Sequence, residues 1–229
     1  MALNKSKGNM YEFVTHTWNT VKGECPHGCG YCYMKGMAKR FCKQQSPIHF
    51  DEKELKTNLG EGNFIFVGSS NDLFARLHPD GWVYDTLAHC CTHHKNRYLF
   101  QSKNPKRMYN NTAFKCFQNS IAGTTIETNR LNKYMGLAPH PVERSFYLRK
   151  INQSGIDTFV TIEPIMDFDL SSFLKLIENV NPIQVNIGAD SGNNHLPEPP
   201  KEKILELIAA LEKFTIVKQK SNLSRILNL

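Results

Sequence analysis

The chain alternates between short apolar runs and longer amphipathic segments. Each apolar run is rich in β-branched and aromatic residues and is followed by a polar loop and then, in several cases, by a helical pattern. Strands that alternate with helices predict a parallel sheet joined by right-handed crossovers. The apolar runs lie at residues 12–18, 63–70, 97–103, 120–127, 157–164, 183–190 and 214–220.

Two of the segments between these runs have clear helical periodicity. In residues 169–180 and 199–214 the apolar side chains recur at three- and four-residue intervals, which places them on one face of a helix. Asp169 or Ser171 can cap the start of the first helix, and prolines precede the second. Residues 82–94 and 142–152 are weaker helical candidates.

The number of strand–helix units limits the fold. About seven units in 229 residues, without a linker-like stretch or a detectable repeat, predict one α/β domain over residues 1–229. A closed (β/α)₈ barrel typically takes about 250 residues. We therefore expect a compact or partial TIM-like (β/α) barrel. A doubly wound open sheet is the alternative, because periodicity does not separate the two architectures.

Composition and charge exclude some classes of protein. Hydrophobic residues at 40% and charged residues at 21% are typical of a soluble globular chain. No apolar run approaches the roughly 20 residues that cross a bilayer, and the first residues lack a signal-peptide core. We therefore expect a cytoplasmic protein without a membrane partner. The formal charge of +7 permits a nucleic-acid partner, and equally a solvated basic surface.

Polar groups gather where the apolar runs end. The sequences at these positions are GSSND, QSKNP, TIETN, IEPIMD, NIGADSG and KQKSN. In both candidate architectures ligands bind at the carboxyl ends of the strands. These loops are therefore expected to form one shared site.

Three of the seven cysteines lie in the glycine-rich loop at residues 23–36. Its sequence, GECPHGCGYCYMKG, places Cys25, Cys29 and Cys32 at Cys-x₃-Cys-x₂-Cys spacing. A structural zinc site takes four ligands and would also need His27 or Cys42. His27 lies too close in sequence to its flanking cysteines to coordinate easily beside them. A [4Fe–4S] cluster held by three thiolates keeps one iron open for another ligand.

Three of the four remaining cysteines predict no site of their own. Cys90, Cys91 and Cys116 are expected to be small buried side chains, because free cysteine packs as a small hydrophobe.

The cysteine loop resembles the signature of the radical S-adenosylmethionine superfamily. Cys25, Cys29, Tyr31 and Cys32 match its Cys-x₃-Cys-x-aromatic-Cys pattern. Further segments follow in the expected order, and within the superfamily the chain is similar to a branch of small, phage-associated proteins of unassigned function. The later segments are IFVGSSNDLF, YLFQSKNPKRM, TIET, TIEPI, NIGADSG and FTIVKQ.

This resemblance implies a barrel of the radical S-adenosylmethionine type and a reaction. The three cysteines would bind three irons, and S-adenosylmethionine would chelate the fourth. An external electron donor of flavodoxin or ferredoxin type would supply the electron that cleaves S-adenosylmethionine to a 5′-deoxyadenosyl radical. That radical would abstract hydrogen from an unidentified substrate, for which we expect a nucleic-acid base or nucleotide.

The resemblance also implies a set of cofactor-binding residues around the strand ends. The loop GSSND replaces the superfamily's usual double glycine and glutamate, so its individual roles are open. The residues implied are Tyr31, Ser69, Ser70, Asn71, Asp72, Ser102, Lys103, Glu127 and Glu163.

The sequence is also compatible with a function of a different class. A zinc-stabilised, non-catalytic nucleic-acid-binding module would use Cys25, Cys29, Cys32 and Cys42 together with the basic surface. Against it, the chain lacks a second pair of closely spaced cysteines and has far more α/β organisation than such a module needs.

Overall fold

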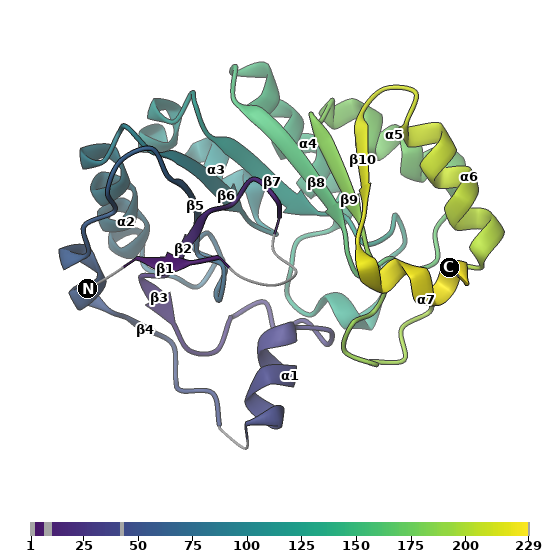
Figure 1. The fold of residues 1–229 in the computed structure, drawn as a ribbon, viewed down its shortest axis with the longest axis horizontal. Helices are drawn as coiled ribbons and strands as arrows, with labels where there is room; N and C mark the ends of the chain where they lie inside the picture. Colours follow the sequence, from purple (N-terminus) through teal and green to yellow (C-terminus); the bar gives the residue numbers. More distant parts are fainter. Residues whose placement is uncertain (1–2, 7–10, 42–43, 229) are drawn as a thin grey trace.

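The fold is built on one curved, eight-stranded sheet. In the computed structural model, which describes residues 3–6, 11–41 and 44–228, the strand order is β1-β2-β5-β6-β7-β8-β9-β10 (Figure 1). Strands β2 and β5 to β10 run parallel, and β1 pairs antiparallel with β2. The strands are β1 (Asn4–Lys5), β2 (His16–Trp18), β5 (Phe64–Val67), β6 (Arg97–Gln101), β7 (Ile121–Thr125), β8 (Asp157–Ile162), β9 (Gln184–Ile187) and β10 (Ile216–Gln219).

The strand order separates the two predicted architectures. The parallel strands follow one another in chain order without a reversal, whereas a doubly wound sheet reverses its order at a switch point. The α/β class is confirmed, and each of the seven predicted apolar runs contains one parallel strand. Among the described residues no pairing joins β10 to β1, so closure of the barrel is not found.

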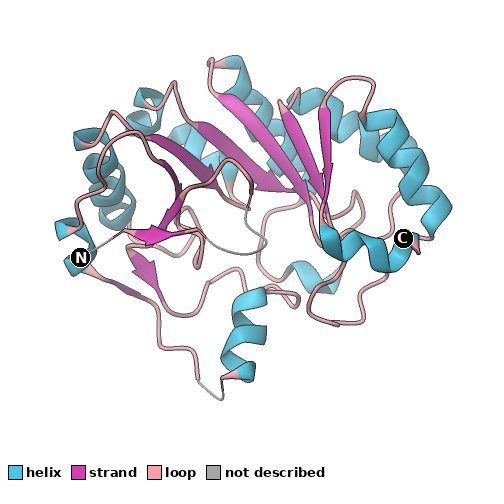
Figure 2. Cartoon of the chain, in the orientation of Figure 1, coloured by secondary structure: helices cyan, strands magenta, loops and turns pink. Residues whose placement is uncertain are grey.

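The helices between the strands cover the outer face of the sheet (Figure 2). Because the crossovers are right-handed and the strand order never reverses, successive helices fall on the same face. The principal helices are α2 (Asp80–Thr92), α3 (Pro105–Asn110), α4 (Pro141–Gln153), α5 (Leu170–Val180) and α6 (Lys201–Leu211). The short 3₁₀ helices are η1 (Glu52–Lys56), η2 (Thr112–Cys116), η3 (Lys133–Met135) and η4 (Ser221–Leu223).

Helix α5 shows how the sequence pattern becomes packing. Its buried residues Phe173, Ile177 and Val180 lie at helical spacing and join the main core between sheet and helices. The helix ends where Asn181 adopts a left-handed conformation with φ of 54°, which asparagine tolerates better than most residues. The four predicted helical segments correspond to α2, α4, α5 and α6.

The expectation of small buried cysteines is correct for Cys90 and wrong for Cys116. Cys90 is fully buried in α2, and Cys91 is partly buried. Cys116 is exposed because it ends η2, whose inward side is taken by the neighbouring rings of Phe114 and Phe117.

A second apolar cluster fills the inner face of the sheet. Along β5, Ile65 and Val67 pack into the main core, whereas Phe64 and Phe66 point to the opposite face, as strand alternation requires. The N-terminal segment 11–14 packs over this face, and the ring of Tyr11 lies 4.8 Å from that of Phe159. This segment, rather than a closed ring of strands, covers the inner side.

The remaining elements lie below the sheet in Figure 1 or at the C-terminal end. A two-stranded sheet, β3 (Val21–Lys22) with β4 (His49–Phe50), flanks the cysteine loop, and α1 (Tyr33–Arg40) follows that loop. The last helix is α7 (Ser224–Leu227). No helix in the described part of the chain combines the length and apolarity needed to cross a membrane.

Candidate active site

One pocket of about 530 Å³ opens at the carboxyl ends of the parallel strands. It is lined by the cysteine loop and by the loops that follow β5, β6, β8 and β10. The polar strand ends therefore meet at one site, as the sequence predicts. The predicted residues on its wall are Cys25, Cys29, Tyr31, Cys32, Ser69, Ser70, Asn71, Asp72, Ser102, Lys103 and Glu163.

The cysteine loop is held against the segment around η3 by backbone contacts. The amide of Gly30 donates to the carbonyl of Tyr134 at 2.8 Å, and the amide of Leu137 donates to the carbonyl of His27 at 2.7 Å. Gly136 has a φ of +60°, and a Cβ there would lie 2.1 Å from the His27 carbonyl oxygen. Glycine is therefore required at this close approach.

The three thiols are free and differ in burial. Cys29 is buried, and its Sγ lies 3.5 Å from the carbonyl oxygen of Met135, whereas Cys25 and Cys32 are partly exposed. Burial and the negative charge of Asp72 raise the pKa of Cys25 to about 11, and burial raises the pKa of Cys29. Without metal both thiols are protonated at neutral pH, so binding a metal must release protons.

The cysteine loop offers three thiols, the number that leaves one iron of a four-iron cluster open. Among the described residues, no three His, Cys, Asp or Glu side chains lie close enough together to share one metal ion. In a four-iron cluster each thiolate binds a different iron, so its ligands need not converge on one point. The fourth ligand that a zinc site would need, Cys42, lies outside the described residues.

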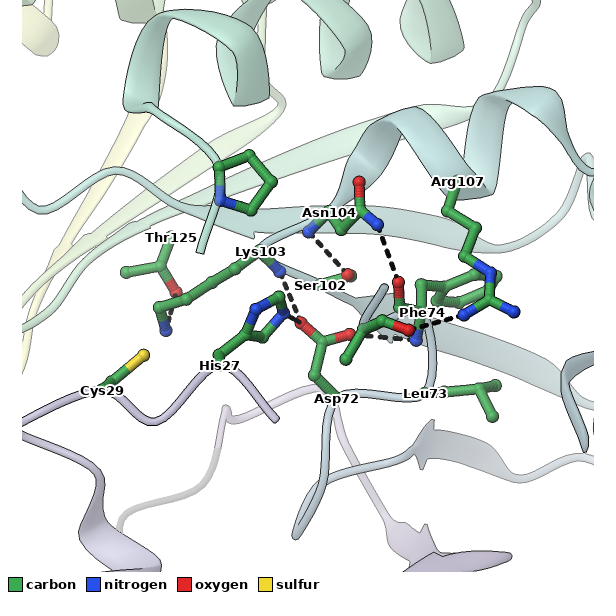
Figure 3. Close-up of polar contacts among 12 residues, drawn as sticks. His27, Cys29, Asp72, Leu73, Phe74, Ser102, Lys103, Asn104, Arg107 and Thr125 are labelled. Atoms are coloured by element: carbon green, nitrogen blue, oxygen red, sulfur yellow. Dashed lines mark hydrogen bonds and ion pairs between the residues drawn. The ribbon is translucent and has the colours of Figure 1, made fainter. Parts of the chain in front are cut away.

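Asp72 connects the cysteine loop to the strand ends (Figure 3). Its Oδ2 lies 2.8 Å from Nε2 of His27 and accepts the backbone amide of Lys103 at 2.7 Å, while Oδ1 accepts the amide of Phe74 at 3.0 Å. Burial alone would raise the pKa of Asp72, but His27 and hydrogen bonds that include the Lys103 amide lower it to about 2. Asp72 is therefore ionised, and both of its carboxylate oxygens have hydrogen-bond partners.

The loop after β5 also holds polar groups at the pocket. The Ser70 amide donates to Oδ1 of Asn19 at 2.8 Å, and the Ser69 hydroxyl is paired with the same side chain. The Asn71 amide nitrogen donates to the Gly23 carbonyl at 3.1 Å, whereas its Oδ1 is buried without a hydrogen-bond partner among the described residues. This oxygen is an acceptor without a donor on the pocket wall.

Lys103 and Tyr31 face each other near Cys29. The Lys103 ammonium lies 5.4 Å from the centre of the Tyr31 ring and 3.4 Å from the Thr125 hydroxyl. Figure 3 shows its side chain extending toward Thr125 and the Cys29 sulfur. A cation on this wall is suited to bind an anionic group of a ligand.

Glu127 is predicted to bind the cofactor, and the structure buries it completely beside Tyr31. It does not line the pocket. Its carboxylate accepts the Tyr31 hydroxyl, lies 3.8 Å from the Lys103 ammonium and pairs with Arg144 at 2.8 Å. Burial alone would raise the pKa of Glu127, but Arg144 and Lys103 hold it below its usual value.

Arg144 was missed by the sequence reasoning. Its side chain is fully buried, and its guanidinium also donates to the carbonyls of Pro139 at 2.6 Å and Thr125 at 2.8 Å. The available signal is its position in α4, where it shares the buried face with Leu148 and Ile151. A charge on an apolar helical face implies a buried partner.

Glu163 also lines the pocket. Its two oxygens are 2.9 Å from the Lys220 ammonium and 3.0 Å from the Asn222 amide nitrogen. Gly188 allows this placement, because a Cβ there would lie 2.8 Å from the Glu163 side chain. Lys220 also lies over the Tyr11 ring at 5.2 Å, so this wall joins the pocket to the inner apolar cluster.

A comparison with protein families places most of the chain in one of them. The model of a family described as "Protein of unknown function (DUF5131)" matches residues 9–201. That range includes the cysteine loop and the strand ends through β9. No curated protein matches the chain.

Solved structures of spore photoproduct lyase share the fold. A double variant with bound AdoMet and dinucleoside spore photoproduct has a TM-score of 0.62 at 10% identity, covering 94% of this chain and 80% of that one. A cysteine-to-serine variant has a TM-score of 0.64 at 12% identity, covering 92% and 78%. The complex with dinucleoside spore photoproduct has a TM-score of 0.61 at 11% identity, with the same coverage. Identity this low shows a common fold alone.

Proposed function

The chain belongs to the DUF5131 family, and from its site we propose that this member is a radical S-adenosylmethionine enzyme acting on a nucleic-acid base or nucleotide. The observation that carries the proposal is the presence of three free thiols, from one loop, in one pocket at the strand ends. The fold shared with spore photoproduct lyase, a radical S-adenosylmethionine enzyme, supports it.

In this proposal Cys25, Cys29 and Cys32 hold three irons of a [4Fe–4S] cluster and the fourth iron is left for S-adenosylmethionine. When bound, such a cluster supplies one-electron reductive cleavage of S-adenosylmethionine. The bound AdoMet in a protein of the same fold supports this choice of cofactor. A flavodoxin- or ferredoxin-type electron donor and the phage-associated branch remain expectations.

The chain's own residues would bind and orient S-adenosylmethionine. Lys103 provides a cation for its carboxylate, and the unpartnered Oδ1 of Asn71 provides an acceptor for its ammonium group. Asp72 already accepts bonds from His27 and the Lys103 amide, which supports a role in fixing the cysteine loop.

The part of the pocket wall around Glu163 would receive the substrate. Glu163 is held by Lys220 and Asn222, so its carboxylate is oriented without a ligand. The neighbouring Tyr11 and Gln101 add a ring and an amide, which are the groups that recognise the face and edge of a base. The dinucleoside in structures of the same fold supports a nucleic-acid substrate.

The test is made on anaerobically reconstituted protein. We expect close to four irons and four sulfides per chain, and 5′-deoxyadenosine after addition of dithionite and S-adenosylmethionine. Cys29→Ala is expected to lose both iron and product. Cys116→Ala is the matched control, because this thiol is exposed and lies outside the pocket.

Two results would refute the proposal. Stoichiometric zinc without iron or sulfide would favour the zinc-stabilised module. Equal iron content and equal 5′-deoxyadenosine in wild type and Cys29→Ala would mean that the cysteine loop does not hold the cluster.

A further inference from the structure

Helix α1 exposes an apolar face with no partner in the described structure. Tyr33, Met37 and Phe41, which follows its last turn, are 53%, 46% and 60% exposed. Their four-residue spacing places them on one side. No residue of α1 is buried, whereas each of the principal helices α2 to α6 contributes buried residues to the fold. An exposed apolar face of this kind indicates a binding surface.

The segment that carries this face has charges of one sign. Residues 25–50 contain no aspartate or glutamate. Lys35, Lys39 and Arg40 on α1 are all exposed, and Lys35 is tethered to the Gly28 carbonyl at 3.0 Å. An exposed basic segment without acidic residues of its own is suited to a polyanion.

The face is continuous with the pocket. Tyr33, Met34 and Lys35 line the pocket, and the Tyr33 hydroxyl donates to the Ser69 carbonyl at 2.6 Å. A molecule that lies along α1 therefore reaches the pocket mouth. An acidic protein would satisfy the charge, but in covering α1 it would also cover this mouth.

We propose that α1 is the platform on which a single-stranded nucleic acid lies while one of its bases enters the pocket. Bases stack on Tyr33 and Phe41, and phosphates contact Lys39 and Arg40, the combination that binds single strands without reading their sequence. The substrate is then a base within a strand, not a free nucleotide. The identity of the reaction at that base rests on the proposed function, whereas the binding surface does not.

A second surface has similar chemistry and provides a control. On α3 and α4, Tyr109 and Phe146 are 38% and 50% exposed, and the Lys150 ammonium lies 5.6 Å from the Phe146 ring. Neither aromatic residue lines the pocket, and α3 and α4 cover the outer face of the sheet. The two surfaces differ in position relative to the pocket.

The experiment measures binding of a labelled single-stranded oligonucleotide of about 12 nucleotides to the full chain by fluorescence anisotropy. We expect the Met37→Ala/Phe41→Ala variant to bind roughly fivefold or more weakly. For Lys39→Ala/Arg40→Ala, the slope of log K against log salt should fall by about 1.4, because each lost phosphate contact removes about 0.7. These residues are chosen because they do not line the pocket.

The surface of Tyr109 and Phe146 supplies the control variant. Tyr109→Ala/Phe146→Ala should bind as wild type does. The proposal is overturned if this control weakens binding while the α1 variants do not, or if wild type does not bind the oligonucleotide. Iron content and S-adenosylmethionine cleavage are measured separately on wild type, so failure of the radical mechanism leaves the binding result intact.

Discussion

At the scale of single residues, the buried ion pair of Glu127 and Arg144 carries a large desolvation cost. Both side chains are fully buried, and the carboxylate also holds the Tyr31 hydroxyl beside the cysteine loop. Removing charges from water costs several kcal/mol for each ion, so each member of the pair depends on the other. The pair therefore orients Tyr31 only while both charges are present.

We expect Glu127→Gln to lower the free energy of unfolding by about 3–5 kcal/mol, because it leaves the Arg144 charge buried without a counterion. Chemical denaturation of the metal-free chain measures this change. Glu143→Gln is the matched control: it breaks the half-exposed pair with Lys106 at 3.7 Å and should cost less than about 1 kcal/mol. Equal effects of the two substitutions would contradict the role of the buried pair.

At the scale of elements, α1 and α5 show opposite sources of stability. Helix α5 is fixed by Phe173, Ile177 and Val180 in the main core. Helix α1 has only two turns and no buried side chain, and it is tethered by the Tyr33 hydroxyl and the Lys35 ammonium. Isolated helices of this length are marginal in water. Its order must come from these tethers or from a ligand.

Backbone amides of residues 33–40 should therefore exchange with solvent much faster than those of residues 170–180. Hydrogen–deuterium exchange with mass spectrometry gives the comparison directly. Tyr33→Phe, which removes the bond to the Ser69 carbonyl, should accelerate exchange in residues 33–40 and leave residues 170–180 unchanged. Protection of α1 equal to that of α5 would show that buried contacts are not what separates them.

At the scale of the whole molecule, Asp72 joins segments that are far apart in the sequence. Its carboxylate contacts His27 in the cysteine loop and the backbone of Lys103 after β6. The low pKa of Asp72 means that the folded state favours its ionised form. Stability from this group is therefore fully present above its unfolded pKa, near 4, and is lost as pH falls toward about 2.

The contribution of Asp72 to stability should be about 2 kcal/mol at pH 5, and roughly half of it should be gone by pH 3. The stability difference between wild type and Asp72→Asn, measured by denaturant unfolding at both pH values, isolates this group. The difference should shrink on acidification. A difference that is constant from pH 5 to pH 3 would contradict the assignment.

How much of the structure the sequence predicts depends on how far apart in the chain the interacting residues lie. The parallel strands and helix α5 follow from local periodicity, and the polar residues after the strands meet because all parallel strands end on one side. The pairing of Glu127 with Arg144 depends on how α4 packs against β7, which no local pattern specifies. Arg144 was therefore missed, and Glu127 was expected at the pocket wall.

The hydrophobic periodicity of the sequence likewise does not determine the order of the strands in the sheet. Only the structure shows that the sheet does not reverse its order and that Tyr11, Phe13 and Val14 cover its inner face. Contacts such as that of Tyr11 with Phe159 join distant parts of the chain. The periodicity of either segment gives no information about the other.

The inner cluster also constrains the order in which the protein can fold during synthesis. Tyr11 leaves the ribosome long before Phe159 in β8, so the inner face stays incomplete until most of the chain has been made. Until then Tyr11 and Phe13 can pack on Phe66 and Phe64 but not on Phe159, so part of this apolar surface stays exposed to water. Long-range closure of this kind is entropically costly and slows folding. The contact of Tyr11 with Phe159 therefore cannot form until β8 has been synthesised.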